Sequence, residues 1–238
     1  MPYFLSDRNL TTGLDVEIAG EEARHILLAH RAKKGERVEL QGPDGKRYEA
    51  EIKEIGRNKL KLEIQHQIAI PQEPNIAITL FQSVVNEKAL DFIFQKGTEL
   101  GLSKIVLFNS ANTAAKLSLE KFAAKKDRWN KILTEAAKQS ERSRWPSLEF
   151  VVDVDGAIEK MKGLDKVFLT DISGQKLNVK SKMSKVALII GPEGGFTQEE
   201  ISQFKQLPNL HTLSLGPILL RTETAALASL AIFHNLIA

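Results

Sequence analysis

Two short glycine-containing segments hold the residues best suited to chemistry. The first is Gly-Pro-Glu-Gly-Gly-Phe at 191–196, and the second is Gly-Pro-Ile-Leu-Leu-Arg-Thr-Glu-Thr-Ala at 216–225. Glycine lets a backbone approach a ligand closely, and proline stiffens a turn. Each segment directly follows an apolar run, so we expect both at strand ends, where open α/β sheets bind ligands. The residues alone therefore predict a small-ligand site lined by stiff backbone turns.

Several other kinds of site are excluded by the sequence. The 191–196 segment does not have the GxGxxG spacing of dinucleotide sites, and the chain has neither a P-loop nor a GxSxG elbow. It has no cysteine, and its five histidines form no HExxH pair, so we expect no metal site. No apolar run reaches the roughly 18 residues of a membrane span, and the first residues do not resemble a signal peptide. We therefore expect a cytoplasmic protein with no membrane partner.

The elements that position these turns divide the chain into two predicted domains. Three stretches alternate apolar and polar residues, the period of half-buried strands, at 38–40, 48–52 and 60–64. With a predicted helix at 21–30, they indicate a small β-barrel over 1–70. Prolines at both ends of 71–74 indicate a linker.

Strand and helix patterns alternate over 75–238. Compact apolar runs predict strands at 76–81, 105–108, 167–169, 186–190 and 213–215. Helical spacing predicts helices at 86–100, from 118 to about 141, and from near 222 onwards, and a Thr-x-x-Glu capping box starts another at 197. Alternation of this kind favours an α/β domain with a mostly parallel sheet covered by helices.

The charge is unevenly distributed. The formal net charge is only +3, but residues 116–146 contain 9 Lys and Arg against 4 Asp and Glu. Such a local excess attracts phosphates, although a solvated helix face would have the same composition.

Four sequence blocks, in this order, resemble the RsmE family of 16S ribosomal RNA uridine-N3 methyltransferases in the SPOUT superfamily. The blocks lie at 95–101, 135–146, 190–197 and 215–225. The resemblance implies an α/β fold with a SPOUT-type trefoil-knotted parallel sheet over 75–238, with helices on both faces. It also implies a PUA-like RNA-binding barrel over 1–70, a homodimer, and methylation of a uridine in 16S ribosomal RNA of the small ribosomal subunit.

The resemblance further implies that S-adenosylmethionine is the cofactor and that strand-end turns hold it. The implied cofactor-binding residues are Leu169, Thr170, Gly191, Pro192, Glu193, Gly194, Gly195, Leu215, Gly216, Ile218, Leu220 and Thr224.

Uridine N3 carries a proton and is a poor nucleophile until that proton leaves. We therefore expect a cation near the base's carbonyl oxygens, for which Arg221 is suited, and a base for the proton, either Glu223 or Glu193. Two alternatives stay open. Arg221 and Glu223 could form a structural charge pair, and hydroxide could remove the proton without a side chain.

Basic side chains in both domains are the expected RNA contacts. They are Arg8, Arg31, Lys33, Lys34, Arg128, Arg142 and Arg144. The chain departs from the family at Ile218, where an Arg is usual, and at 109–112, where Glu-Arg-Ser is usual. Two other functions remain open, a SPOUT enzyme that methylates a ribose 2′-hydroxyl and a non-catalytic RNA-binding assembly protein.

Overall fold

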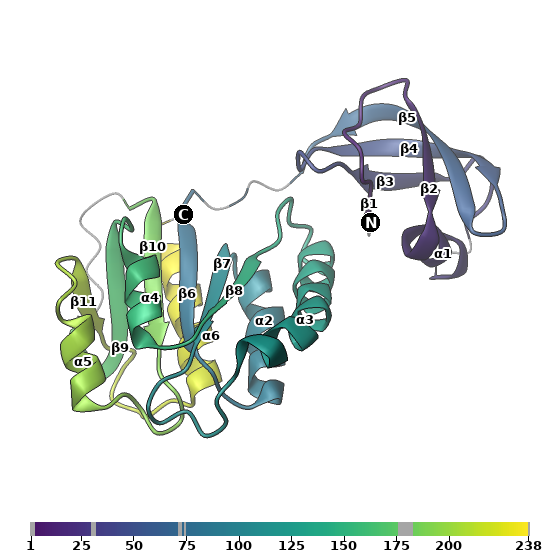
Figure 1. Ribbon diagram of the computed structural model, residues 1–238. Coiled ribbons are helices and arrows are strands. Elements are labelled where there is room, and N and C mark those ends of the chain that lie inside the picture. Colours follow the sequence, from purple (N-terminus) through teal and green to yellow (C-terminus); the bar gives the residue numbers. More distant parts are fainter. Residues whose placement is uncertain (1–2, 30–31, 71–72, 74, 176–182, 238) are drawn as a thin grey trace. The chain divides into compact units, whose positions relative to one another are not determined.

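The computed structural model describes residues 3–29, 32–70, 73, 75–175 and 183–237. They form two compact units (Figure 1). The first contains the described residues up to Glu73 together with Ala137–Arg144, and the second contains 75–136 and the residues from Trp145 onwards. Nothing in the sequence pattern indicated that Ala137–Arg144 belongs to the first unit. Most of the predicted linker at 71–74 lies outside the described residues.

The first unit is a curled five-stranded sheet with one helix. In chain order its elements are β1 Tyr3–Leu5, β2 Asp15–Ala19, α1 Gly20–Ala29, β3 Arg37–Gln41, β4 Arg47–Ile55 and β5 Lys59–Ile68. The strand order is β1-β3-β4-β5-β2, with only the β1–β3 pair parallel. Two register shifts between β4 and β5 increase the local twist. The alternating apolar residues of these strands face one core with α1, which includes Ile26, Leu40 and Leu62.

The second unit contains a six-stranded sheet in which every pairing is parallel. Its strands are β6 Ala77–Ser83, β7 Lys104–Phe108, β8 Ser147–Val151, β9 Lys166–Gln175, β10 Lys185–Ile190 and β11 Leu210–Leu213. The order β11-β9-β10-β6-β7-β8 places β10 and β6 in the middle. These two central strands are buried after their first residue, and β10 is apolar from Val186 to Ile190, as expected for a sheet covered on both faces.

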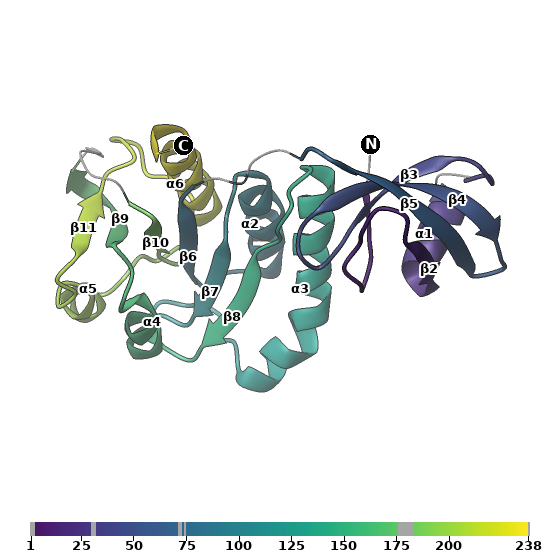
Figure 2. The ribbon, with the colours of Figure 1, turned by 90° about the horizontal axis from the view of Figure 1, so that it is seen from above.

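Helices cover both faces of this sheet (Figure 2). One core contains residues of α2 Glu87–Glu99, α3 Leu119–Gln139 and α6 Thr222–Ile237, and the other contains residues of α4 Val154–Met161 and α5 Gln198–Phe204. The predicted α/β architecture with a parallel sheet and helices on both faces is therefore confirmed.

Local predictions had mixed outcomes. The capping box is present, since the Thr197 hydroxyl accepts from the Glu200 N–H and the Glu200 carboxylate accepts from the Thr197 N–H. The strand predicted at 213–215 was wrong, because the strand in this region, β11, runs from Leu210 to Leu213. Ser214 follows the end of this strand and donates its N–H to the Gln175 carbonyl. Neither β8 nor α4 was predicted.

Candidate functional site

A cavity of about 720 Å³ lies in the second unit, at the carboxyl end of β10 and beside residues 169–172 in the middle of β9. Both glycine segments contribute to its wall, together with the middle of β9 and the start of α6. Its lining residues are Asn86, Leu169, Thr170, Asp171, Ile172, Ile190, Gly191, Pro192, Glu193, Gly195, Phe196, Ile201, Leu215, Gly216, Ile218, Leu219, Leu220, Arg221, Thr222, Glu223 and Ala225. The volume is within the range of about 300–1,000 Å³ that is usual for small-ligand sites.

The first turn runs from Gly191 to Gly195 and is held by hydrogen bonds, including two from a residue outside the turn. Gly195 has a φ of 69°, which favours glycine, and its N–H donates to the Pro192 carbonyl at 3.0 Å. The Asn112 amide donates to the carbonyls of Gly194 at 3.3 Å and Gly195 at 3.0 Å. Asn112 belongs to the segment that departs from the family, so this segment contacts the turn in this chain.

The second turn contains unpaired backbone donors in residues that line the cavity. Gly216 has a φ of 117° and donates its N–H to the Ser214 hydroxyl at 3.3 Å. Within the described residues, no hydrogen bond engages the N–H groups of Ile218, Leu219 or Leu220. Such unpaired donors beside a cavity can be satisfied by a bound ligand.

A buried hydroxyl joins the two turns. Thr222 begins α6, and its hydroxyl donates to the Gly191 carbonyl at 2.7 Å. The same oxygen accepts from the Gln82 side-chain amide at 3.1 Å. Gln82, at the end of β6, is fully buried, and its amide oxygen has no partner within the described part of the chain. The chain Gln82–Thr222–Gly191 therefore fixes the start of α6 against the first turn.

The three predicted catalytic side chains all line this cavity. Arg221 and Glu193 are exposed, and Glu223 is half-buried. The Asn86 amide lies 3.4 Å from a Glu193 oxygen, a long hydrogen bond from the N-cap of α2. No ion pair joins Arg221 to Glu193 or Glu223 in the described structure, so the alternative of a structural Arg221–Glu223 pair has no support.

Ten of the twelve predicted cofactor residues line the cavity, whereas Gly194 and Thr224 do not. Gly194 packs beside Asn112 instead. Sequence reasoning missed Asn86, Asp171, Phe196 and Thr222, which also line it. Thr222 belongs to the second glycine segment, so its position in the sequence could have indicated that it lines the cavity. Asn86 and Asp171 had none, because they reach the cavity only through the fold.

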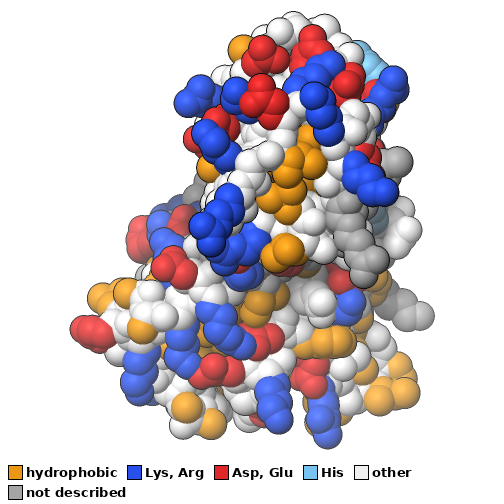
Figure 3. All heavy atoms as spheres, turned by 90° about the vertical axis from the view of Figure 1, so that its right-hand side faces the viewer, with side chains coloured by type: hydrophobic (Ala, Val, Ile, Leu, Met, Phe, Trp, Pro, Cys, Tyr) orange, Lys and Arg blue, Asp and Glu red, His pale blue; other side chains and the backbone are white. Residues whose placement is uncertain are grey.

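Six of the seven predicted RNA-contact residues are described, and they fall into two groups. Arg8, Lys33, Lys34 and Arg144 are exposed, and their side chains have no ion pair among the described residues. Arg128 is ion-paired with Asp91 and Glu87. Arg142 is paired with Glu73, and Arg31 lies outside the described residues. Figure 3 shows Lys and Arg side chains, mixed with acidic ones, over the side of the second unit that carries α3.

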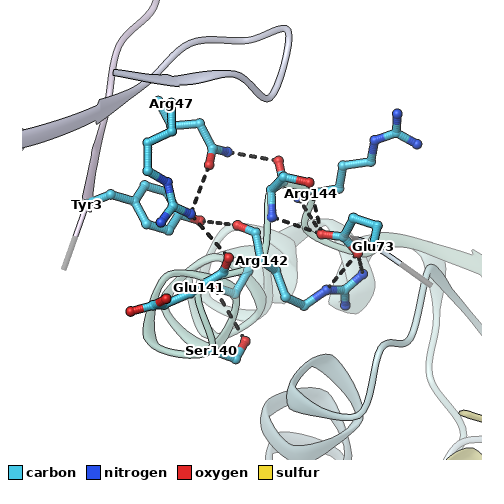
Figure 4. Close-up of polar contacts among 10 residues, drawn as sticks. Tyr3, Arg47, Glu73, Ser140, Glu141, Arg142 and Arg144 are labelled. Atoms are coloured by element: carbon cyan, nitrogen blue, oxygen red, sulfur yellow. Dashed lines mark hydrogen bonds and ion pairs between the residues drawn. The ribbon is translucent and has the colours of Figure 1, made fainter. Parts of the chain in front are cut away.

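The Arg142 side chain has a structural role within the first unit (Figure 4). Its guanidinium donates to Glu73 at 2.8 and 3.2 Å, and it is only 10% exposed. The same carboxylate accepts the N–H groups of Ser143 and Arg144. Burial raises the pKa of Glu73, but the Arg142 hydrogen bond and charge outweigh it and hold that pKa below its ordinary value. These contacts argue against the predicted contact of Arg142 with phosphate.

Arg47 makes a second anchor in this unit (Figure 4). Its guanidinium lies 3.8 Å from the centre of the Tyr3 ring and donates to the Glu141 carbonyl at 3.2 Å. The Tyr3 hydroxyl donates to the Arg142 carbonyl at 2.7 Å. The segment Ala137–Arg144 is therefore held to the curled sheet by partly buried polar contacts.

Among the described residues, no group of three His, Asp or Glu side chains is arranged to hold a metal ion. No helix in the described part is long and apolar enough to cross a membrane.

Comparisons with known proteins cover both units. Residues 71–234 match the family described as RNA methyltransferase domain, and residues 18–65 match the RNA methyltransferase PUA domain. The chain is 31% identical over 241 residues to ribosomal RNA small subunit methyltransferase E of Bacillus subtilis (strain 168), covering 96% of this chain and 94% of that protein.

Two solved structures are similar along almost the whole chain. One is a ribosomal RNA small subunit methyltransferase E from Neisseria gonorrhoeae bound to S-adenosylmethionine, with a TM-score of 0.89, 29% identity, and coverage of 99% of this chain and 98% of that one. The other is a Legionella pneumophila protein, described as a methyltransferase in complex with the same cofactor. It has a TM-score of 0.87 and 29% identity, and covers 98% of this chain and 97% of that one.

Proposed function

This chain belongs to the ribosomal RNA small subunit methyltransferase E family, and from that premise we propose that it methylates N3 of one uridine in 16S ribosomal RNA with S-adenosylmethionine. The observation that carries the proposal is the cavity formed by the Gly191–Gly195 turn and the 215–220 turn. It supports a cofactor site because both turns present backbone groups and apolar side chains to one space.

The cavity residues fit this cofactor in chemistry as well as in size. The free N–H groups of Ile218, Leu219 and Leu220 suit the acceptor nitrogens of an adenine ring, and Leu169, Leu215 and Ala225 offer apolar contacts. We assign Glu193 to the cofactor's ribose hydroxyls or to proton removal. S-adenosylmethionine, when bound, supplies a methyl group made electrophilic by its sulfonium sulfur.

The side chains at the rim of the cavity prepare the uridine. N3 is on the Watson–Crick edge, so the base has to be unpaired to enter the site. Loss of the N3 proton places negative charge on the flanking carbonyl oxygens, and the exposed Arg221 guanidinium stabilises that charge. Glu223 or Glu193 accepts the proton, or hydroxide does so, which leaves the N3 lone pair free to react with an electrophilic methyl group of the kind that S-adenosylmethionine would supply.

We assign initial RNA binding to the exposed, unpaired cations Arg8, Lys33, Lys34 and Arg144. Arg128 and Arg142 are engaged by carboxylates and contribute less to this surface. Because phosphate contacts release counterions, RNA affinity is expected to fall steeply as salt is raised.

We further propose a trefoil knot and a homodimer in the cytoplasm, where the small ribosomal subunit is located. The knot is supported by the path of the chain, since β11 lies at a sheet edge beside β9 whereas α6 returns to pack on β10, β6 and α2. The dimer is supported by the exposed apolar side chains Ile218 and Leu219 at the cavity rim, and light scattering in solution would test it.

Methyl transfer to unmethylated small ribosomal subunits, followed by mass spectrometry of the nucleosides, tests the proposed function. N3-methyluridine formed only with S-adenosylmethionine present is the expected product. A 2′-O-methylated nucleoside would identify the ribose methyltransferase instead. Calorimetry that detects no cofactor binding, together with RNA binding, would identify the non-catalytic assembly protein.

A further inference from the structure

A second cavity, of about 380 Å³, lies in the second unit between the outer face of α3 and the start of the edge strand β8. It is lined by Lys126, Asn130, Thr134, Trp145, Pro146, Ser147 and Leu148. None of these residues lines the larger cavity. The volume is at the low end of the range of about 300–1,000 Å³ for small-ligand sites, enough for a single flat ring system and its substituents.

Trp145 gives this cavity an exposed aromatic wall. The side chain is 42% exposed, whereas the chain's other tryptophan, Trp129, is 1% exposed and packs in the core against Phe94 at 5.6 Å between ring centres. Trp145 is followed by the buried Pro146, whose ring restricts the backbone next to it. A large aromatic side chain held at the surface beside polar groups is the arrangement that stacks on nucleobases in single-stranded nucleic acid sites.

A polar stripe on α3 also lines this cavity. Lys126, Asn130 and Thr134 are four residues apart and so lie on one face of the helix. In the described structure, none of their side chains has a hydrogen bond or ion pair, and Lys126 has only a distant contact with the Phe122 ring at 5.9 Å.

The charge of the cavity selects the class of ligand. Lys126 is the one charged residue among the described lining residues, and no carboxylate is present there. Three other cations of α3 differ from Lys126, because Lys125, Arg128 and Lys138 are each ion-paired with a carboxylate. A free cation, an uncommitted amide and an exposed indole together suit an anionic ligand with a flat, hydrogen-bonding ring.

We propose that this cavity binds one unpaired nucleotide of the RNA, away from the nucleotide that is methylated. The base stacks on Trp145, the Asn130 amide and Thr134 hydroxyl bond its edge, and Lys126 pairs with its phosphate. The inference rests on the proposed function, since it concerns a second contact with the same RNA. Binding of an unpaired base in this cavity would determine which nucleotide of the RNA reaches the larger cavity.

The test compares binding of Trp145→Ala, Trp145→Phe and Leu119→Ala to octamers of oligouridylate and oligoadenylate. Leu119 is exposed on α3 but does not line the cavity, so it is the matched control. Quenching of the exposed tryptophan's fluorescence reports occupancy in the wild type. Loss of one stacked base is expected to weaken binding of Trp145→Ala by about fivefold to 150-fold, with Trp145→Phe and Leu119→Ala close to wild type.

Lys126→Ala provides an independent variant, expected to reduce the slope of log affinity against log salt by about one. Equal octamer affinity of wild type and Trp145→Ala, or no quenching in the wild type, would overturn the inference. If Trp145→Ala bound assembled ribosomal subunits more weakly but bound octamers normally, the partner of this cavity would be a ribosomal protein, and the inference would be overturned too. Methylation by the wild type is measured separately. Normal methylation with unaffected octamer binding refutes this site alone, whereas absent methylation with Trp145-dependent binding refutes the proposed function alone.

Discussion

The hydroxyl of Thr222 is the most direct place to test how the two turns are held together. Thr222→Val keeps the side-chain shape but removes the hydrogen bonds to the Gly191 carbonyl at 2.7 Å and from the Gln82 amide at 3.1 Å. Each such bond contributes about 0.5–1.5 kcal/mol, so the free energy of unfolding is expected to fall by about 1–3 kcal/mol. For a domain of this size, a loss of about 2 kcal/mol lowers Tm by about 4–8 °C.

Cofactor binding is expected to weaken in the same variant, because the Gly191 carbonyl and the start of α6 both line the cavity. A loss of about 1.4 kcal/mol in binding corresponds to a tenfold higher Kd for S-adenosylmethionine, measured by calorimetry. Thr222→Ser keeps the hydroxyl and should retain the affinity. Thr79→Val removes a buried hydroxyl from the same strand as Gln82 and is the control for stability. If Thr222→Val binds S-adenosylmethionine as tightly as the wild type, the proposed coupling between the turns is wrong.

Two further substitutions test other parts of the structure. Arg221→Ala is expected to lower the single-turnover rate of methyl transfer by about 100-fold to 1,000-fold, with a much smaller change in cofactor Kd, and an unchanged single-turnover rate would refute its role. Glu73→Gln is expected to destabilise the first unit by about 1–3 kcal/mol at pH 7 in urea unfolding, because the Arg142 pair is lost. Since the folded state lowers the pKa of Glu73 below its ordinary 4.5, its stabilisation is present above that pH and disappears as pH falls through the lowered value. The difference in free energy of unfolding between wild type and Glu73→Gln should therefore disappear in acid, and a difference that persists at low pH would contradict this origin. The control is Glu54→Gln, which removes the exposed ion pair with Lys61 and should leave the stability as in the wild type.

The parts of the site that could be predicted from the sequence were those encoded locally. Glycines and prolines directly after apolar runs indicated two turns at strand ends, and the structure brings both turns to one cavity. The Thr197–Glu200 capping box could be predicted for the same reason, since its two residues are three apart and each side chain bonds the other's backbone N–H.

Contacts between distant segments had no local pattern. Gln82 and Thr222 are 140 residues apart, and Asn112 reaches the first glycine turn from the loop after β7. The fold also shows that the segment 109–112, where the chain departs from the family, is bonded to this turn through Asn112. β8 escaped prediction because it is a half-buried edge strand, and α4 because it has only eight residues. The role of Ala137–Arg144 in the first unit depends on partners distant in sequence, the half-buried Glu73 and the buried Arg47, which no spacing could reveal.

Nucleoside mapping of 16S ribosomal RNA from cells with and without this protein tests the central claim most directly. We expect one N3-methyluridine that is present with the intact gene, absent after its deletion, and restored by the wild-type protein but not by Arg221→Ala. A modification pattern that is identical in the two strains, or a difference confined to a ribose 2′-hydroxyl, would contradict it.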